Sequence, residues 1–117
     1  MQLTRDPTVV ATARRHAVDA CRAQLDESRC EDLALAVSEL VTNAIRYGRE
    51  PVTLAVRQVG ARVRVEVTDA NPTPPAVVDT ATEQLATGRR GLTLVAGLCR
   101  RWGWEPSGEG KRVWCEI

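Results

Sequence analysis

The clearest hydrophobic pattern in the chain runs from Asp32 to Gly48, where apolar residues recur at intervals of three and four. This spacing, without Pro or internal Gly, predicts one amphipathic helix. Ser28 or Asp32 could cap its start, and Gly48 stands where a left-handed C-cap is common. The apolar stripe comprises Leu33, Val37, Leu40, Ala44 and Ile45.

Two polar residues, Glu39 and Asn43, interrupt this helix and share one face because they are four positions apart. They can be read as part of a solvent-facing stripe. They can also be read as a metal–nucleotide site, in which an amide oxygen binds Mg²⁺ and a carboxylate orients or deprotonates a nucleophile. The helix alone does not decide between these readings.

Strict alternation of apolar and polar residues predicts two hairpins later in the chain. The order of elements predicts an α+β two-layer sandwich, with a mixed, mostly antiparallel sheet covered on one face by about three helices. At 117 residues, the chain is expected to form a single domain, residues 1–117. The other predicted elements are an edge strand at Met1–Thr4, helices at Val9–Leu25 and Leu92–Arg101, and strands at Pro51–Val59, Arg62–Asp69, Trp102–Pro106 and Lys111–Ile117.

Asp69 ends one of these strands and has the same parity as the inward-facing Val63, Val65 and Val67. If the strand is regular, the carboxylate points toward the core, where it needs a hydrogen-bond donor such as a heterocyclic amine. Alternatively, Asp69 only caps the turn that follows it.

The segment from Asn71 to Thr87 is rich in Pro and then polar, which is typical of a functional loop, a lid or a partly disordered stretch. It leads to Gly88-Arg89-Arg90-Gly91, directly before a predicted helix. Glycines and arginines at a helix start can bind a phosphate through backbone N–H groups and side-chain charge. We expect this helix start, the polar helix pair and Asp69 to border one cleft between the layers.

Composition narrows the class of protein without naming a function. The net charge of +1 provides no field for attracting nucleic acid or an anionic membrane. No apolar run is long enough to span a membrane, and we expect a cytoplasmic protein. The four cysteines have no CxxC spacing and are expected to act as small apolar residues.

Several of these stretches resemble the sequence boxes of the GHKL ATP-binding superfamily. SELVTNAIRYG, which contains Glu39, Asn43 and Arg46, resembles the N box. Asp69 resembles the adenine-binding residue of the G1 box, Arg90-Gly91-Leu92 the G2 box, and Gly110 to Trp114 the closing strand. Within the superfamily, the chain is most similar to small anti-sigma-factor serine/threonine kinases and to stand-alone actinobacterial proteins like them.

The resemblance implies the Bergerat fold, with Mg-ATP bound between helices and sheet. It implies that Glu39 is the general base, that Asn43 is the Mg²⁺ ligand and that Asp69 accepts a hydrogen bond from adenine. Arg46, Asn71, Arg90, Gly91 and Leu92 are expected to complete the nucleotide site. It also implies a sigma factor or a serine-bearing anti-sigma antagonist as the partner, with no direct contact to nucleic acid or membrane, and it allows a homodimer.

Other positions depart from the family pattern. Asn71, Pro72 and Thr73 stand where the G1 box usually has glycines, Arg89 stands where the G2 box often has Gly, and Arg112 stands where a Thr near adenine is usual. These departures favour an alternative function, a non-catalytic module that sequesters a transcription regulator. A third alternative, the ATP-binding part of a split histidine kinase, has less support because the sequence has no phosphoacceptor helix pair.

Overall fold

The computed structural model describes the backbone of residues 1–75 and 90–117, and the side chains of these residues except 90–93. Most of the predicted loop at 71–87, together with Gly88 and Arg89, therefore lies outside the described residues. In chain order the elements are β1 (Gln2–Leu3), α1 (Val9–Cys21), α2 (Glu27–Tyr47), β2 (Val52–Val59), β3 (Arg62–Asp69), α4 (Arg90–Leu98), β4 (Arg101–Ser107) and β5 (Gly110–Glu116).

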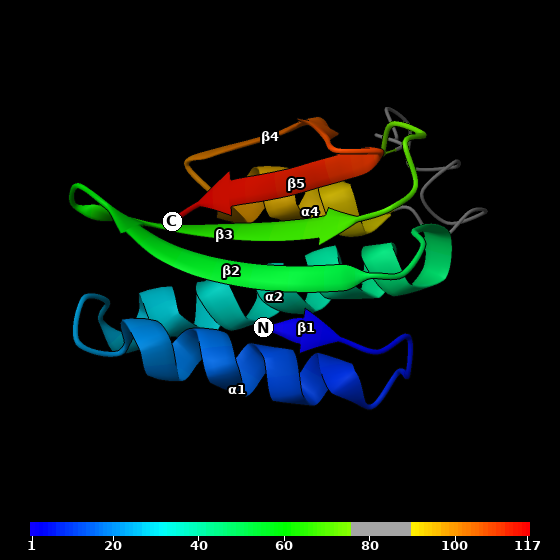
Figure 1. The fold of residues 1–117 in the computed structure, drawn as a ribbon. Coiled ribbons are helices and arrows are strands. Elements are labelled where there is room, and N and C mark those ends of the chain that lie inside the picture. The colour runs from blue at the N-terminus through cyan, green and yellow to red at the C-terminus, as the bar shows by residue number, and fades with distance from the viewer. Residues whose placement is uncertain (76–89) are drawn as a thin grey trace.

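The strands form one sheet in the order β1-β2-β3-β5-β4, and α1, α2 and α4 cover one of its faces (Figure 1). This arrangement confirms the predicted α+β two-layer fold. The four strand pairings among the described residues are antiparallel, so the described sheet is antiparallel and not mixed. Of the helices in the described ranges, none combines the length and apolar character that crossing a bilayer requires.

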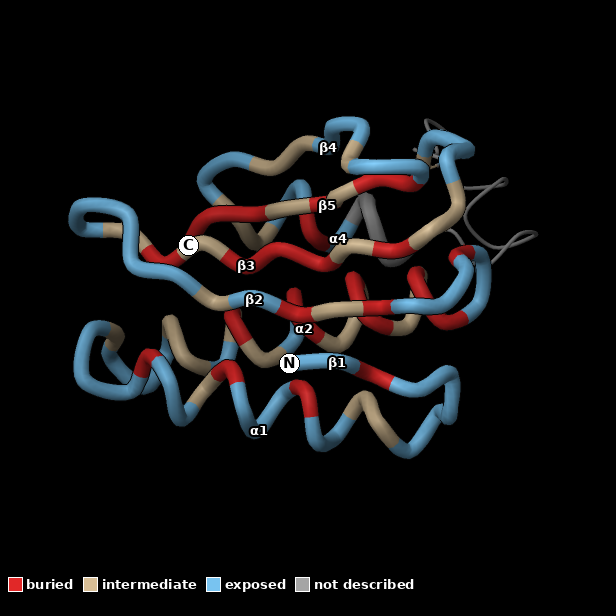
Figure 2. Tube along the Cα trace, in the orientation of Figure 1, coloured by how far each residue is buried: buried red, intermediate tan, exposed pale blue. Residues whose placement is uncertain are grey.

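The core lies between the sheet and α2, the central helix. The predicted stripe of α2 is buried, and on β3 the inward residues Val63, Val65 and Val67 are at most 2% exposed. Figure 2 shows this burial as an almost continuous path along β3 and β5 and as a repeating pattern on the helices. Cys21 and Cys115 are buried in this core, and all four cysteines are free thiols.

α2 ends at Tyr47 with Gly48 as its C-cap, as predicted, but its start and the conformation of Gly48 differ from the prediction. The helix begins five residues earlier, at Glu27, because the Asp26 carboxylate accepts a hydrogen bond from the backbone N–H of Arg29 at 2.8 Å. This makes Asp26 the N-cap, so the prediction of Ser28 or Asp32 is wrong. Gly48 has φ −88° and ψ −170°, which is extended and not left-handed backbone.

The structure gives a different reason for glycine at position 48. A Cβ there would lie 2.5 Å from the Ala44 carbonyl oxygen and 2.7 Å from Cγ of Asp69. Gly48 therefore allows the end of α2 to approach the carboxylate at the end of β3.

The outer face of the sheet carries a network of charged side chains. Glu116 is only 3% exposed and pairs with Arg62, Arg64 and Arg101 at 3.2–3.5 Å. The Arg64 guanidinium also lies 4.1 Å from the centre of the Trp114 ring. Burial raises the pKa of the Glu116 carboxyl, but Arg101 and the hydrogen-bonding Arg64 and Arg62 outweigh it and hold that pKa below its usual value.

We predict that Gly48→Ala lowers the free energy of unfolding by about 1–3 kcal/mol, because the added methyl group overpacks the contact with Asp69. Gly97→Ala is the matched control. A Cβ at Gly97, on α4, meets no atom within 4 Å, so this change should be neutral or stabilising by up to about 1 kcal/mol. Urea unfolding of both variants tests this, and equal stability of G48A and wild type would contradict it.

We predict that Glu116→Gln lowers stability at pH 7 by about 1 kcal/mol, because the arginine partners lose their carboxylate. A carboxyl with a depressed folded-state pKa stabilises the fold above its unfolded pKa, about 4.3. That stability is lost as the pH falls through the folded-state value. Thermal unfolding from pH 7 to pH 3 should therefore show a shallower acid dependence for E116Q, while Glu105→Gln, in an exposed pair, should follow wild type.

Candidate functional site

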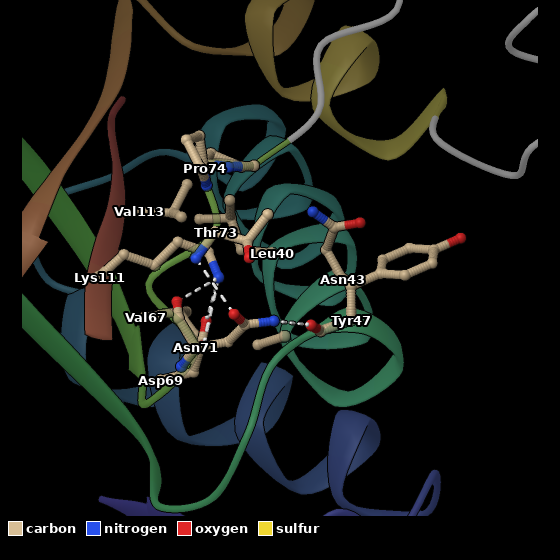
Figure 3. A pocket seen from close by; sticks show the side chains of 12 residues that line it. Leu40, Asn43, Tyr47, Val67, Asp69, Asn71, Thr73, Pro74, Lys111 and Val113 are labelled. Carbon is tan, nitrogen blue, oxygen red and sulfur yellow. Dashed lines mark hydrogen bonds and ion pairs between the residues drawn. The ribbon is translucent and has the colours of Figure 1, made fainter. Parts of the chain in front are cut away.

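A cavity of about 280 Å³ opens between the helix layer and the sheet, where α2 and β3 end and β5 begins. Its volume is close to the lower end of the range of small-molecule sites, roughly 300–1,000 Å³. Figure 3 shows its lining side chains. They come from Leu40, Asn43, Ala44, Tyr47, Val67, Asp69, Asn71, Thr73, Pro74, Pro75, Lys111 and Val113.

Asp69 lies in the wall of this cavity and is 3% exposed. Its Oδ1 accepts hydrogen bonds from the backbone N–H groups of Asn71 at 2.7 Å and Arg49 at 3.4 Å. The carboxylate therefore points to the core side of the sheet, as its parity predicted, and also caps the following turn, while its hydrogen bond to a heterocyclic amine stays a prediction. Gly110 permits the close strand approach at this point, since a Cβ there would lie 1.9 Å from the Asp69 carbonyl oxygen.

Lys111 is the site residue that the sequence analysis missed. It pairs with Asp69 across β3 and β5, and its Nζ lies 3.1 Å from Oδ2 and 3.2 Å from Oδ1 of the carboxylate. The same Nζ donates to the carbonyl oxygen of Asn71 at 3.0 Å. Its parity with Val113 was the available signal, because residues of equal parity on a strand share a face.

Arg112 was expected near the base position, but it faces the other side of the sheet. Its guanidinium pairs with Glu105 at 3.0 Å and contacts the Ser107 hydroxyl at 3.4 Å. The regular alternation of β5 explains this correction, because Lys111 takes the inward position and Arg112 the outward one.

Asn43 and Glu39 occupy different places relative to the cavity. Asn43 lines it from α2, whereas Glu39 is half-buried one turn earlier and is not among the lining residues. Leu40, the residue after Glu39, does line the cavity, so the cavity extends along α2 beyond Asn43. Within the described part of the chain, no hydrogen bond engages the Asn43 amide, which leaves its oxygen available to a ligand.

Asn71 fastens the chain after β3 to the end of α2. Its side-chain amide donates to the Tyr47 carbonyl oxygen at 2.8 Å, and its side-chain oxygen accepts from the Thr73 N–H at 3.1 Å. Tyr47 lines the cavity, while the neighbouring Arg46 is exposed, with its guanidinium 5.9 Å from the Tyr47 ring centre. The substitution of Asn for the expected glycine thus adds contacts at the cavity rim.

The predicted phosphate-binding residues lie at the start of α4. The helix begins at Arg90, two residues before the predicted Leu92. The side chains of Arg90, Gly91 and Leu92 fall outside the described set, and so does Arg89, so their predicted roles stay predictions. The described part of α4 packs beside α2.

The residues of the cavity fit an adenine nucleotide with a magnesium ion in their chemistry. A buried carboxylate offers acceptors to an amino group, and an amide oxygen is a hard ligand of the kind Mg²⁺ takes. No cluster of three or more His, Cys, Asp or Glu occurs among the described residues. Mg²⁺ in nucleotide sites commonly takes most of its ligands from phosphate and water, so a single amide oxygen is compatible with such a site.

Comparisons with known proteins agree with this geometry. The chain resembles several solved structures, among them the histidine kinase domain from the Erythrobacter litoralis EL346 blue-light activated histidine kinase, with a TM-score of 0.57 and 21% identity. The match covers 93% of this chain and 60% of that one, and at this identity it shows the fold alone. No curated protein matches the sequence. The model of the histidine kinase-like ATPase domain matches residues 3–117, so the chain belongs to this family of the GHKL superfamily.

Proposed function

We propose that this protein is an ATP-binding regulator of the anti-sigma type, a serine/threonine kinase that phosphorylates an antagonist protein. The observation that carries the proposal is that Asp69 and Asn43, from the sheet and the helix layer, line the same cavity. One suits the amino group of a base and the other a phosphate-bound metal ion.

We assign the roles of the side chains from their positions together with the resemblance to the GHKL boxes. Asp69 holds the base and Asn43 ligands Mg²⁺, since both line the cavity. The resemblance to the G2 box is what supports the start of α4 as the phosphate site, which would bind through its N–H groups. Glu39, one turn before Asn43, takes the proton from a serine hydroxyl of the partner. Mg-ATP supplies the phosphoryl group and neutralises charge when bound, and most of the catalysis is positioning.

We further propose a sigma factor and its serine-bearing antagonist as the partners. The net charge of +1 supports protein partners over nucleic acid, because it provides no general attraction to phosphate backbones. Glu39 is half-buried and lies outside the cavity wall, so a hydroxyl delivered by another protein could reach it from the side of α2.

A second candidate function is a partner-binding module without catalysis. The observation that favours it is the ion pair of Lys111 with Asp69, which already gives the carboxylate a cationic partner. A protein of this kind would bind its partner with the same affinity in the presence and absence of ATP.

We predict that the protein binds ATP more tightly with Mg²⁺ than with EDTA, and that Asn43→Ala removes most of this gain, about tenfold. Isothermal titration calorimetry of both proteins, with and without Mg²⁺, measures it. Thr12→Ala, at an exposed position on α1, is the control and should bind like wild type. Absence of ATP binding in wild type, together with partner binding that ignores ATP, would favour the second candidate.

We predict that Glu39→Gln binds Mg-ATP within about twofold of wild type but transfers phosphate to a candidate antagonist at least ~100-fold more slowly, because the general base is lost. Phosphoserine formed from labelled ATP gives the rate. Glu31→Gln, exposed and two turns earlier on α2, should keep the full rate. An E39Q variant as fast as wild type would remove Glu39 from the mechanism.

A further inference from the structure

The Asp69–Lys111 pair combines an unused acceptor and an unused donor in one cavity wall. Oδ1 of Asp69 accepts from two backbone N–H groups and from Lys111, whereas Oδ2 has Lys111 as its only partner among the described residues. A carboxylate offers about four acceptor positions, and three donors among the described residues hold that of Asp69, namely two backbone N–H groups and the Lys111 ammonium, so one position remains on the side of Oδ2.

The ammonium group of Lys111 has a matching surplus. It carries three protons, and its partners within the described residues are the Asp69 carboxylate and the Asn71 carbonyl oxygen. One proton therefore remains for a ligand. The Lys111 side chain is 8% exposed and the Asp69 side chain 2% exposed, so both groups are largely shielded from water. Hydrogen bonds to charged groups are strongest in such surroundings.

Adenine carries the complementary pattern on one edge, where the 6-amino group donates and the adjacent ring nitrogen N1 accepts. This edge lies farthest from the sugar, so a nucleotide could present it to the cavity wall without its sugar or phosphates in between. We propose that Lys111 donates a charge-assisted hydrogen bond to N1 of the adenine whose amino group Asp69 accepts. The two side chains then recognise adjacent groups on the same edge of the base. This inference rests on the proposed function.

The ion pair of Lys111 with Asp69 then helps to bind the base and does not block it. A lysine that merely neutralised Asp69 would compete with the base for the carboxylate. A lysine fixed by Asn71 and Asp69, with one proton left, instead presents a preorganised donor beside the acceptor. Lys111 is then a binding residue that makes the site select an unprotonated ring nitrogen next to an amino group.

The test compares ATP with 1-deaza-ATP, which has C–H in place of N1 and keeps the amino group. Isothermal titration calorimetry with the full chain should show wild type binding 1-deaza-ATP about 10- to 100-fold more weakly than ATP. The 7-deaza analogue, altered on the edge nearer the sugar, should bind within about threefold of ATP. The ligand change needs no variant, so protein folding does not enter this comparison.

Lys111→Met, which keeps an apolar stem of similar length, should bind ATP and 1-deaza-ATP with the same affinity. Arg112→Met is the matched control, because it removes a charge from the same strand on the opposite face and should keep the wild-type discrimination. Thermal unfolding confirms that each variant is folded.

Three outcomes would overturn the inference. They are equal binding of ATP and 1-deaza-ATP by wild type, a K111M variant that still discriminates, and a K111M variant that binds ATP more tightly than wild type. The last outcome would make Lys111 a competitor of the base. Failure of wild type to bind ATP at all would instead refute the proposed function, so the two failures are distinguishable.

Discussion

The structure depends on one constraint, the placing of a nearly buried carboxylate where the helix layer and the sheet meet. A buried charge is costly unless donors surround it, and Asp69 has two backbone N–H groups and the Lys111 ammonium. Gly48 and Gly110 make this possible, because a side chain on either would collide with Asp69 or the backbone beside it. The ends of α2 and β3 and the start of β5 therefore converge on one polar group in an otherwise apolar layer.

The same convergence forms the cavity. Apolar side chains from α2, β3 and β5 make its sides, and the polar groups are concentrated at the end of β3. Asn71 links this end to the carbonyl oxygen of Tyr47, so the end of α2 and the end of β3 are joined at the rim of the cavity. A site built in this way is positioned by regular elements, which hold side chains more firmly than loops do.

The fold and part of the site could be predicted from the pattern of residues. Alternation in β3 placed Asp69 on the same side as its valines. The spacing of Glu39 and Asn43 placed both on one face of α2 but did not decide between a solvent stripe and a site. Lys111 was missed because lysine is rarely buried, although its parity with Val113 was visible. The burial of Lys111 depends on a partner 42 positions away in the sequence, which no local pattern reveals.

Two local predictions were wrong or incomplete for physical reasons of the same kind. The helix signal of α2 was read from apolar spacing, which is silent about the polar first turn that Asp26 caps. Gly48 was explained by backbone conformation, whereas its role is the space it leaves for a distant carboxylate. Of Glu39 and Asn43, only Asn43 lines the cavity, although the cavity extends along α2 to Leu40, the residue after Glu39.

The two edges of the sheet have a consequence for self-association. β1 has only two residues, and β4, at the other edge, contains Pro106, which has no backbone N–H to offer a further strand. Short edge strands and edge prolines discourage one molecule from extending its sheet into the next. Two such molecules would therefore associate through their side chains. The backbone hydrogen bonds of one sheet would not continue into the sheet of the other molecule.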